Sequence, residues 1–334
     1  MPRASSILKM SKPPLIVLVG PTAVGKTALA VELALRLNGE VVSADSRYFY
    51  RGMNIGAAKP TREEMRGVPH HLIDVAEPDE TWSLAQFQQA ALAAIGAIQA
   101  RGRMPLLVGG TGQYIRAVTQ GWTPPEVPPN PRLRAALENL AAENSVYWLH
   151  AKLKILDPLA AERIDARNLR RTVRALEVIF STGRLFSRQT GQSESPFALF
   201  QAGLSRPREE LYRRVDTRVE SMFAQGFLEE VRGLLEKGFS PDLPSMSAIG
   251  YREAAAVLRG EMSLEDAKIQ MKRATRIFVR RQTNWFKPDD PQIHWFALDE
   301  YDAETIARVI SQQLLGQSAV NGNVALESAR WLGL

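Results

Sequence analysis

Short apolar runs and longer helical patterns alternate along the first 120 residues of the chain. The apolar runs have strand length and cover residues 15–19, 41–45 and 104–108. Between them, leucines recur at helical spacing from Leu29 to Leu37, and a second helical pattern covers residues 84–100. Strands that alternate with helices are typical of a doubly wound sheet whose strands run mostly parallel. We therefore predict an α/β fold of this class.

A proline-dense segment, Pro124 to Pro131, interrupts the alternation and reads as a semi-rigid hinge. Beyond it the pattern is only helical as far as residue 195, residues 197–204 resemble a returning strand, and the chain from 208 to about 315 is mostly helical. We predict a catalytic core with a helical insertion and a loosely held tail. The core comprises residues 1–122 and 197–316, the insertion residues 123–196, and the tail residues 317–334.

A glycine-rich segment directly follows the first apolar run. It has the G-x-x-x-x-G-K-[ST] spacing of a P-loop between strand and helix and consists of Gly20, Pro21, Thr22, Ala23, Val24, Gly25, Lys26 and Thr27. In this interpretation backbone N–H groups surround a phosphate, Lys26 reaches its outer oxygens, and Thr27 offers a hydroxyl to Mg²⁺. The alternative is an ordinary glycine turn with a solvated lysine. The motif does not say which bond of the substrate breaks.

Two further polar residues fall at the C-terminal ends of predicted strands, where α/β folds place their ligands. Asp45 ends the second run, so we expect it beside Lys26, and Thr111 follows the third run. That third run carries no terminal carboxylate to hold Mg²⁺, which argues against a routine ATPase. Asp45 then has four possible roles: metal partner, ribose ligand, general base or helix cap.

Composition narrows the functional classes. The chain of 334 residues has no cysteine, which excludes disulfides, thiol catalysis and cysteine-ligated zinc. Of four histidines only His70 and His71 are adjacent, and we interpret both as structural. Met1 to Pro14 lack the core of a signal peptide, and no apolar run approaches the roughly 20 residues of a membrane span. We expect a cytoplasmic protein without membrane contact.

A formal net charge of +6 suggests a polyanionic partner, and the charge is concentrated in two stripes. In the insertion, one helix face carries Arg167, Arg170, Arg171 and Arg174, opposite an apolar face of Leu169, Val173, Leu176 and Phe180. Near the C-terminus, the second stripe combines Arg273, Arg276, Arg280, Arg281 and Lys287 with Trp285 and Phe286. Either stripe alone fits a solvated helix face, but two beside a phosphate site favour nucleic acid.

Nine segments of the chain closely resemble the tRNA dimethylallyltransferase family. They are residues 20–27, 43–47, 50–56 with 58–60, 70–74, 106–114, 174–178, 226–231, 248–253 and 281–286. The resemblance spans residues 15–287, and the missing cysteines indicate the bacterial type, without the zinc finger of eukaryotic relatives. The chain departs from many bacterial members at Tyr48, at Ala57 and across residues 167–171.

The resemblance implies transfer of a dimethylallyl group from dimethylallyl diphosphate to N6 of the adenosine 3′ of the anticodon, in tRNAs reading codons that start with U. The P-loop would hold the diphosphate with Mg²⁺, and the protein would act as a monomer. The implied catalytic residues are Asp45 as general base, Thr111 at the mouth of the channel, and Arg218, with Thr22, on the diphosphate. The implied tRNA contacts are Asp45, Ser46, Arg47, Tyr48, Thr111, Arg134, Arg167, Arg170, Arg171, Arg174, Arg273, Arg276, Arg280, Arg281 and Gln282.

Three alternatives share some of these features. An adenylate isopentenyltransferase has a similar core but prenylates a free nucleotide, for which the long basic insertion is unnecessary. A P-loop nucleoside or metabolite kinase would consume ATP without a prenyl donor. A tRNA-binding protein with a degenerate site is disfavoured because Lys26, Thr27 and Asp45 are all intact.

Overall fold

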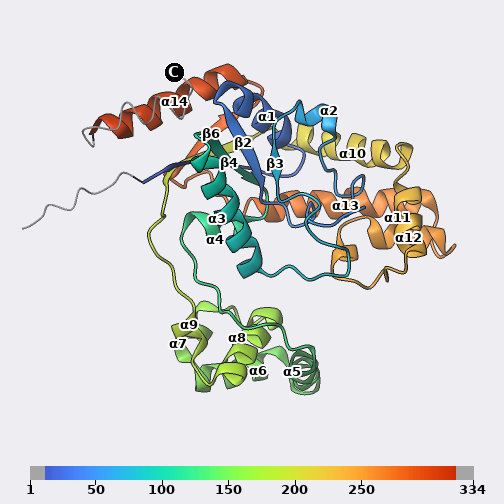
Figure 1. The fold of residues 1–334 in the computed structure, drawn as a ribbon. Helices are drawn as coiled ribbons and strands as arrows, with labels where there is room; N and C mark the ends of the chain where they lie inside the picture. The colour runs from blue at the N-terminus through green and yellow to red at the C-terminus, as the bar shows by residue number, and fades with distance from the viewer. Residues whose placement is uncertain (1–11, 321–334) are drawn as a thin grey trace, which may run out of the picture. The chain divides into compact units, whose positions relative to one another are not determined.

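One six-stranded sheet forms the centre of the fold (Figure 1). The computed structural model describes residues 12–320. The strand order is β3-β2-β4-β1-β5-β6, and every neighbouring pair is parallel. The strands are β1 (Pro14–Val19), β2 (Gly39–Ser43), β3 (His70–His71), β4 (Met104–Gly109), β5 (Ala198–Ser205) and β6 (Ile293–Ala297). The predicted α/β class with a parallel sheet is confirmed.

Alternate residues of the central strand β1 enter two different cores. Ile16 and Leu18 pack with apolar side chains of α1 (Lys26–Arg36) and α14 (Ala303–Val320). Leu15, Val17 and Val19 belong to the other core, with side chains of α3 (Leu84–Ala100) and α4 (Gly112–Thr119). A sheet buried on both faces needs such a continuous apolar strand, which explains the unbroken run at residues 15–19.

A further group of helices lies around the carboxyl ends of the strands (Figure 1). Helix α10 packs against α13, and α11 packs against α12. The elements are α2 (Arg62–Met65), α10 (Arg208–Ala224), α11 (Phe227–Glu236), the 3-10 turn η1 (Ser245–Ser247), α12 (Tyr251–Leu258) and α13 (Leu264–Gln282). No helix within residues 12–320 is both long enough and apolar enough to cross a membrane.

A separate compact unit comprises Gln120–Glu194, and the chain up to Thr119 and from Ser195 onward forms the other. The helices of the unit Gln120–Glu194 are α5 (Pro131–Asn144), α6 (Val146–Leu156), α7 (Pro158–Arg163), α8 (Leu169–Thr182) and α9 (Phe186–Gln189). They enclose a core of their own that includes Leu137, Leu153 and Leu176. Its entry and exit segments run side by side, because the Thr123 amide donates to the Gly191 carbonyl at 3.0 Å.

Several details differ from the sequence predictions. Strands β3 and β6 were not anticipated, and β2 ends at Ser43 rather than at Asp45. Phe180, predicted on the apolar face of its helix, is 55% exposed, whereas Val173 and Leu176 of that face are buried. Helix α14 continues to Val320, so the predicted tail begins inside a helix, and its remainder lies outside the described residues.

Candidate active site

The P-loop connects β1 to α1 through backbone conformations that require glycine. Gly20 has φ 151°, and a Cβ there would lie 2.8 Å from the Leu204 carbonyl oxygen. Gly25, at φ 116°, occupies the N-cap of α1, so the helix begins at Lys26 with its amides at the loop. A helix N-terminus of this kind attracts anions through unpaired N–H groups and the helix dipole. The predicted strand–loop–helix context of the motif is therefore present.

Lys26 is folded over the loop that precedes it. Its Nζ donates to the carbonyl oxygens of Gly20 at 2.9 Å and Pro21 at 2.8 Å. Burial lowers the pKa of Lys26 to about 8, Asp45 raises it through its charge, and Arg218 lowers it further. The charges of Asp45 and of Arg218 in α10 therefore both act on the Lys26 ammonium.

Two arginines that sequence reasoning missed hold the loop from outside. Arg206 Nε donates to the Val24 carbonyl at 2.9 Å, and Arg214 Nε donates to the Ala23 carbonyl at 2.7 Å. Ala23 has φ 67°, a conformation that costs a residue with a Cβ of the order of 1 kcal/mol and needs such support. Both arginines add positive charge beside the phosphate loop. The only signal in the sequence was their position in and before the helix that carries Arg218.

Gln282 links the two glycine-rich loops of the site. Its Oε1 accepts from the Thr22 amide at 2.7 Å, and its Nε2 donates to the Gly110 carbonyl at 3.2 Å. The side chain is buried, with 5% of the residue exposed. Gln282 was expected to contact tRNA, but its amide group is engaged by the protein backbone, so we interpret it as a brace between the P-loop and the loop that carries Thr111.

Asp45 lies two residues beyond β2, in a tight turn. Its Oδ1 accepts from the Arg47 amide at 2.9 Å, and its carbonyl accepts from the Tyr48 amide at 3.2 Å. Ser46 lies within this turn and is half-buried. The Arg47 guanidinium donates to the Pro244 and Ser245 carbonyls, each at 3.2 Å, which ties the turn to η1. The turn thus fixes the Asp45 carboxylate just beyond the carboxyl end of β2.

Tyr48 points back toward the phosphate loop. Its hydroxyl donates to the Ala58 carbonyl at 2.8 Å. Burial raises the pKa of Tyr48 well above its usual range, and the Asp45 charge raises it further, whereas Arg218 and a hydrogen bond with Thr27 act in the opposite direction. Tyr48 is therefore protonated and lies against Thr27, the residue predicted to bind Mg²⁺.

Thr111 directly precedes α4, and its carbonyl accepts from the Tyr114 amide at 2.9 Å. Trp285 packs across the next residue so closely that a Cβ on Gly112 would lie 2.3 Å from its ring. Arg116 donates to the Trp285 carbonyl at 2.9 Å and lies over the indole at 5.4 Å. Phe286 is 5% exposed. The two aromatic residues of the second basic stripe therefore pack against the site loop and the core.

The predicted tRNA-contacting arginines fall into three groups. Four pair with acids: Arg134 and Arg174 with the buried Glu177, Arg167 with Asp165, and Arg276 with Asp216. Arg174 also donates to the Val127 carbonyl at 2.8 Å, so it holds the proline hinge rather than facing outward. Arg47 is held by the backbone of residues 244 and 245, as described above. The other five have no acidic partner among the described residues and are exposed: Arg170, Arg171, Arg273, Arg280 and Arg281. Arg167 and Arg170 line a surface hollow at the start of α8.

Comparison with known proteins identifies the family. The family model "IPP transferase" matches residues 48–289, and "Isopentenyl transferase" matches residues 13–81. A tRNA dimethylallyltransferase of Thermomicrobium roseum is 47% identical over 95% of this chain and 96% of the relative. The chain belongs to the tRNA dimethylallyltransferase family. A second family member, from a Roseiflexus species, is 50% identical over 90% of this chain and 98% of the relative.

Solved structures of tRNA dimethylallyltransferases share the fold. A tRNA isopentenylpyrophosphate transferase from Bacillus halodurans is 41% identical, with a TM-score of 0.69 over 92% of this chain and 99% of that chain. A eukaryotic dimethylallyltransferase, described as acting on tRNA, is 28% identical, with a TM-score of 0.74 over 92% of this chain and 80% of that chain. The predicted membership of this family is confirmed.

Proposed function

We propose that the chain transfers a dimethylallyl group from dimethylallyl diphosphate to N6 of adenosine 37 of tRNAs that read codons starting with U. The observation that carries this proposal is the grouping of Lys26, Asp45 and Arg218 beside a P-loop in a chain of this family. Diphosphate would bind at the loop and helix N-terminus, with Lys26 and Arg218 as its cationic partners. The products would be N6-isopentenyladenosine and diphosphate.

The residues have distinct roles in this reaction. The allylic C–O bond breaks and its electron pair leaves with the diphosphate, while the adenine N6 forms the new C–N bond and gives up a proton. Loop amides, Lys26 and Arg218 would stabilise the charge that develops on the leaving group. Asp45, held by the Arg47 amide, would accept the N6 proton, an assistance typically worth about 10²- to 10⁴-fold. Thr111, at the start of α4, would contact the entering nucleotide.

Magnesium fits the site as a partner of the substrate. Within residues 12–320 no group of three or more acidic or imidazole side chains forms a metal site. Mg²⁺ usually binds substrate phosphates and few protein ligands, so Thr27 with the diphosphate would suffice. The ion would supply further charge neutralisation of the leaving group. Thr27 already lies against the Tyr48 hydroxyl, which would orient its own hydroxyl.

The exposed arginines would bind the tRNA anticodon stem-loop. Arg170 and Arg171 of the insertion, and Arg273, Arg280 and Arg281 of α13, are exposed and form no ion pair with an acid among the described residues. Arg167 is also exposed but pairs with Asp165. Phosphate contacts by such side chains give affinity without sequence reading. The target adenosine must leave the loop stack to reach Asp45, which single-stranded loops make inexpensive. We place the reaction in the cytoplasm, with the protein as a monomer.

Direct transfer of label tests this proposal. Dimethylallyl diphosphate labelled in the prenyl group is incubated with Mg²⁺ and an anticodon stem-loop, with AMP, or with neither. Label on the stem-loop supports the proposal. AMP is the acceptor of the second candidate, an adenylate isopentenyltransferase, and is included because the "Isopentenyl transferase" family model matches residues 13–81.

A further inference from the structure

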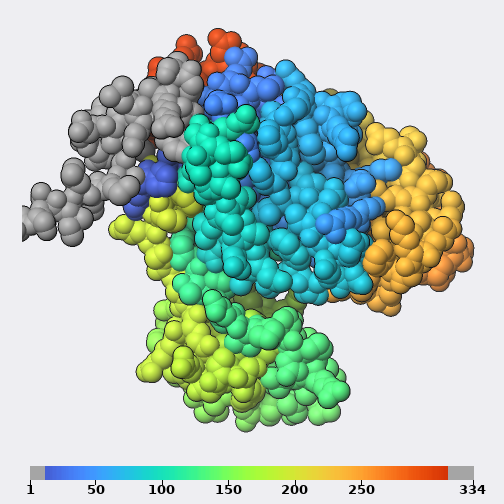
Figure 2. Space-filling model, in the orientation of Figure 1, coloured from blue at the N-terminus to red at the C-terminus, as the bar shows by residue number. Residues whose placement is uncertain are grey.

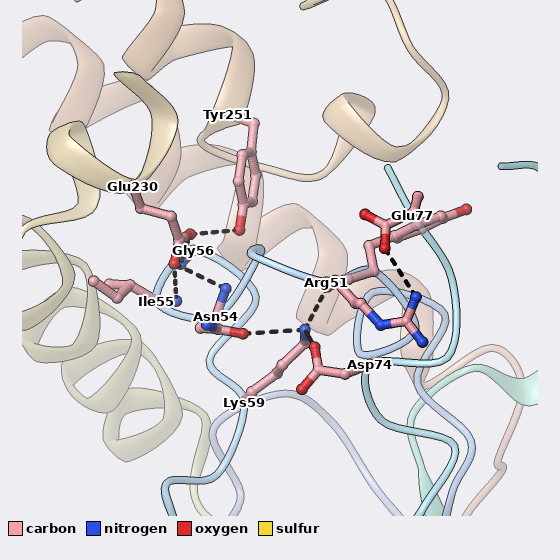
Figure 3. Close-up of polar contacts among 10 residues, drawn as sticks. Arg51, Asn54, Ile55, Gly56, Lys59, Asp74, Glu77, Glu230 and Tyr251 are labelled. Carbon is pink, nitrogen blue, oxygen red and sulfur yellow. Dashed lines mark hydrogen bonds and ion pairs between the residues drawn. The ribbon is translucent and has the colours of Figure 1, made fainter. Parts of the chain in front are cut away.

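Three of the segments that carry the family resemblance meet outside the phosphate loop. They are residues 50–56 with 58–60, 226–231 and 248–253, and the reaction described above uses none of them. Figure 3 shows Asn54, Ile55 and Gly56 converging on Glu230 of α11, with Tyr251 of α12 approaching from the other side. In Figure 2 the blue segment that contains residues 50–60 adjoins the orange region of α11 and α12 at the surface.

The Glu230 carboxylate accepts four hydrogen bonds, three from the backbone of residues 54–56 and one from Tyr251. Its Oε2 accepts from the amides of Asn54 at 2.8 Å and Ile55 at 2.6 Å. Its Oε1 accepts from the Gly56 amide at 3.1 Å and from the Tyr251 hydroxyl at 2.8 Å. Three consecutive N–H groups directed at one anion form the concave backbone arrangement that binds anions in proteins. Here the anion is a side chain of the protein itself.

The approach is so close that only glycine fits at its centre. A Cβ on Gly56 would lie 2.2 Å from the Phe227 ring and 2.7 Å from the Tyr251 ring. A second tie lies on the other side of the segment, where Lys59 Nζ donates to the Tyr50 carbonyl at 2.5 Å, to Asp74 at 2.6 Å and to Asn54 Oδ1 at 3.2 Å. The segment is therefore held on two sides.

The anchored segment leads directly to the reaction site. Ala58, two residues after Gly56, has φ 55°, an unfavourable conformation for a residue with a Cβ. Its carbonyl accepts the Tyr48 hydroxyl at 2.8 Å. Tyr48 in turn lies against Thr27 and within the fields of Asp45 and Arg218. A continuous set of contacts thus runs from Glu230 to the residue predicted to hold Mg²⁺.

We propose that Glu230, oriented by Tyr251, is a positioning residue that fixes residues 54–58 and, through the Ala58 carbonyl, places the Tyr48 hydroxyl beside Thr27. The proposal rests on the proposed function only in taking the P-loop as a diphosphate site. A residue that merely stabilised the fold would lower the melting temperature without acting through Tyr48. Only a positioning role predicts that loss of Glu230 and loss of the Tyr48 hydroxyl have non-additive effects on diphosphate affinity.

The first test measures hydrogen exchange in Glu230→Gln. Glutamine has one acceptor oxygen where the carboxylate has two, so the two donors that face its new NH₂ group lose their acceptor. We expect the amides that lose it, either those of Asn54 and Ile55 or that of Gly56, to exchange about tenfold faster, while the strands of the sheet keep their protection. Glu229→Gln is the matched control, because Glu229 is exposed on the same helix and pairs only with Arg232 at 3.7 Å among the described residues. Unchanged exchange at these amides would overturn the proposal.

The second test measures affinity for inorganic diphosphate with Mg²⁺ by calorimetry. We expect Glu230→Gln and Tyr48→Phe each to weaken binding by about fivefold, and the double variant to be no weaker than either alone. Independent, multiplied losses would show that Glu230 does not act through Tyr48. Should Glu230→Gln fail to fold, Tyr251→Phe removes one of the four donors and leaves the carboxylate, and must show the same non-additivity with Tyr48→Phe.

Failure of this proposal is separable from failure of the proposed function. The exchange and diphosphate experiments need no prenyl transfer. If wild-type protein transferred no label to tRNA yet showed the exchange change and the non-additivity, the positioning role would stand and the reaction would be wrong. If label transfer occurred and Glu230→Gln behaved like Glu229→Gln in both assays, the reaction would stand and the positioning role would be refuted.

Discussion

At the scale of residues, the proposed general base Asp45 can be tested directly by substitution. Its carboxylate is held by a backbone amide and lies beside Lys26. We predict that Asp45→Ala lowers kcat at least about a hundredfold because the N6 proton loses its acceptor. Affinity for tRNA, measured by filter binding, should stay within about twofold. Unchanged turnover would remove Asp45 as the base.

Lys26 gives a pH-dependent prediction. Burial lowers its pKa to about 8 in the protein without ligand, so above that pH much of it is neutral. A bound diphosphate favours the charged form and raises the pKa again. Binding of dimethylallyl diphosphate at about pH 9 should therefore take up a proton, whereas binding at about pH 6 should not. Calorimetry in two buffers of different ionisation enthalpy measures this uptake, and its absence at the higher pH would contradict the environment described for Lys26.

Gln282 separates the sequence prediction from the structural interpretation. As a tRNA contact, its loss would weaken tRNA binding; as a brace between Thr22 and Gly110, its loss would disturb the phosphate loop. We predict that Gln282→Met raises KM for dimethylallyl diphosphate by about tenfold and leaves the Kd for tRNA nearly unchanged. The reverse pattern would restore the role that the sequence suggested.

At the scale of elements, the helix α8 contains arginines with opposite functions. Arg170 and Arg171 are exposed, whereas Arg174 pairs with the buried Glu177 at 2.6 Å and holds the hinge. We predict that Arg170→Ala with Arg171→Ala weakens tRNA binding and lowers the slope of log Kd against log salt by about 1 to 2, without change in Tm.

Arg174→Ala should behave differently from its neighbours. It leaves Glu177 with Arg134 as its remaining side-chain partner, so we expect a loss of about 1–3 kcal/mol in stability, seen as a lower Tm. The salt dependence of tRNA binding should be unaltered. A steep loss of tRNA affinity with unchanged Tm would mean that Arg174 faces the RNA after all.

The elements also show how far sequence reasoning reached. Long, strongly patterned elements were predictable: the expected helix at 84–100 has the bounds of α3, since Ser83 caps its first turn. The two missed strands lie at the ends of the sheet order. Strand β3 has only two residues, too few for a pattern, and β6 is a five-residue run with aromatic residues inside a region dominated by helical spacing.

Contacts over long sequence separation limited the prediction of the site. The P-loop and Asp45 were identifiable because local spacing and strand ends mark them. Arg214, Gln282 and Glu230 reach the site across separations that no local pattern encodes, such as the 260 residues between Thr22 and Gln282. Pairing with acids was equally hard to predict, because Glu177 lies three residues after Arg174, just beyond the arginines that made this face of α8 look wholly basic.

At the scale of the whole molecule, the chain forms two units with separate cores, and we assign diphosphate binding to one and a part of tRNA binding to the other. The unit Gln120–Glu194 has its own apolar core, and its entry and exit are paired through Thr123 and Gly191. Replacing it by a short glycine-serine linker should therefore leave the other unit folded, because little loop-closure entropy is added. We predict retained diphosphate binding and loss of tRNA binding, measured by calorimetry and filter binding. Full tRNA affinity in this variant would contradict the role of the insertion.

The most direct test of the central claim is transfer of labelled dimethylallyl group in the presence of Mg²⁺. An anticodon stem-loop with adenosine at position 37 is compared with AMP and with an ATP-only control. We predict label on the stem-loop alone, and its loss when adenosine 37 is replaced by another nucleoside. Label on AMP, or ATP turnover without label transfer, would contradict the account.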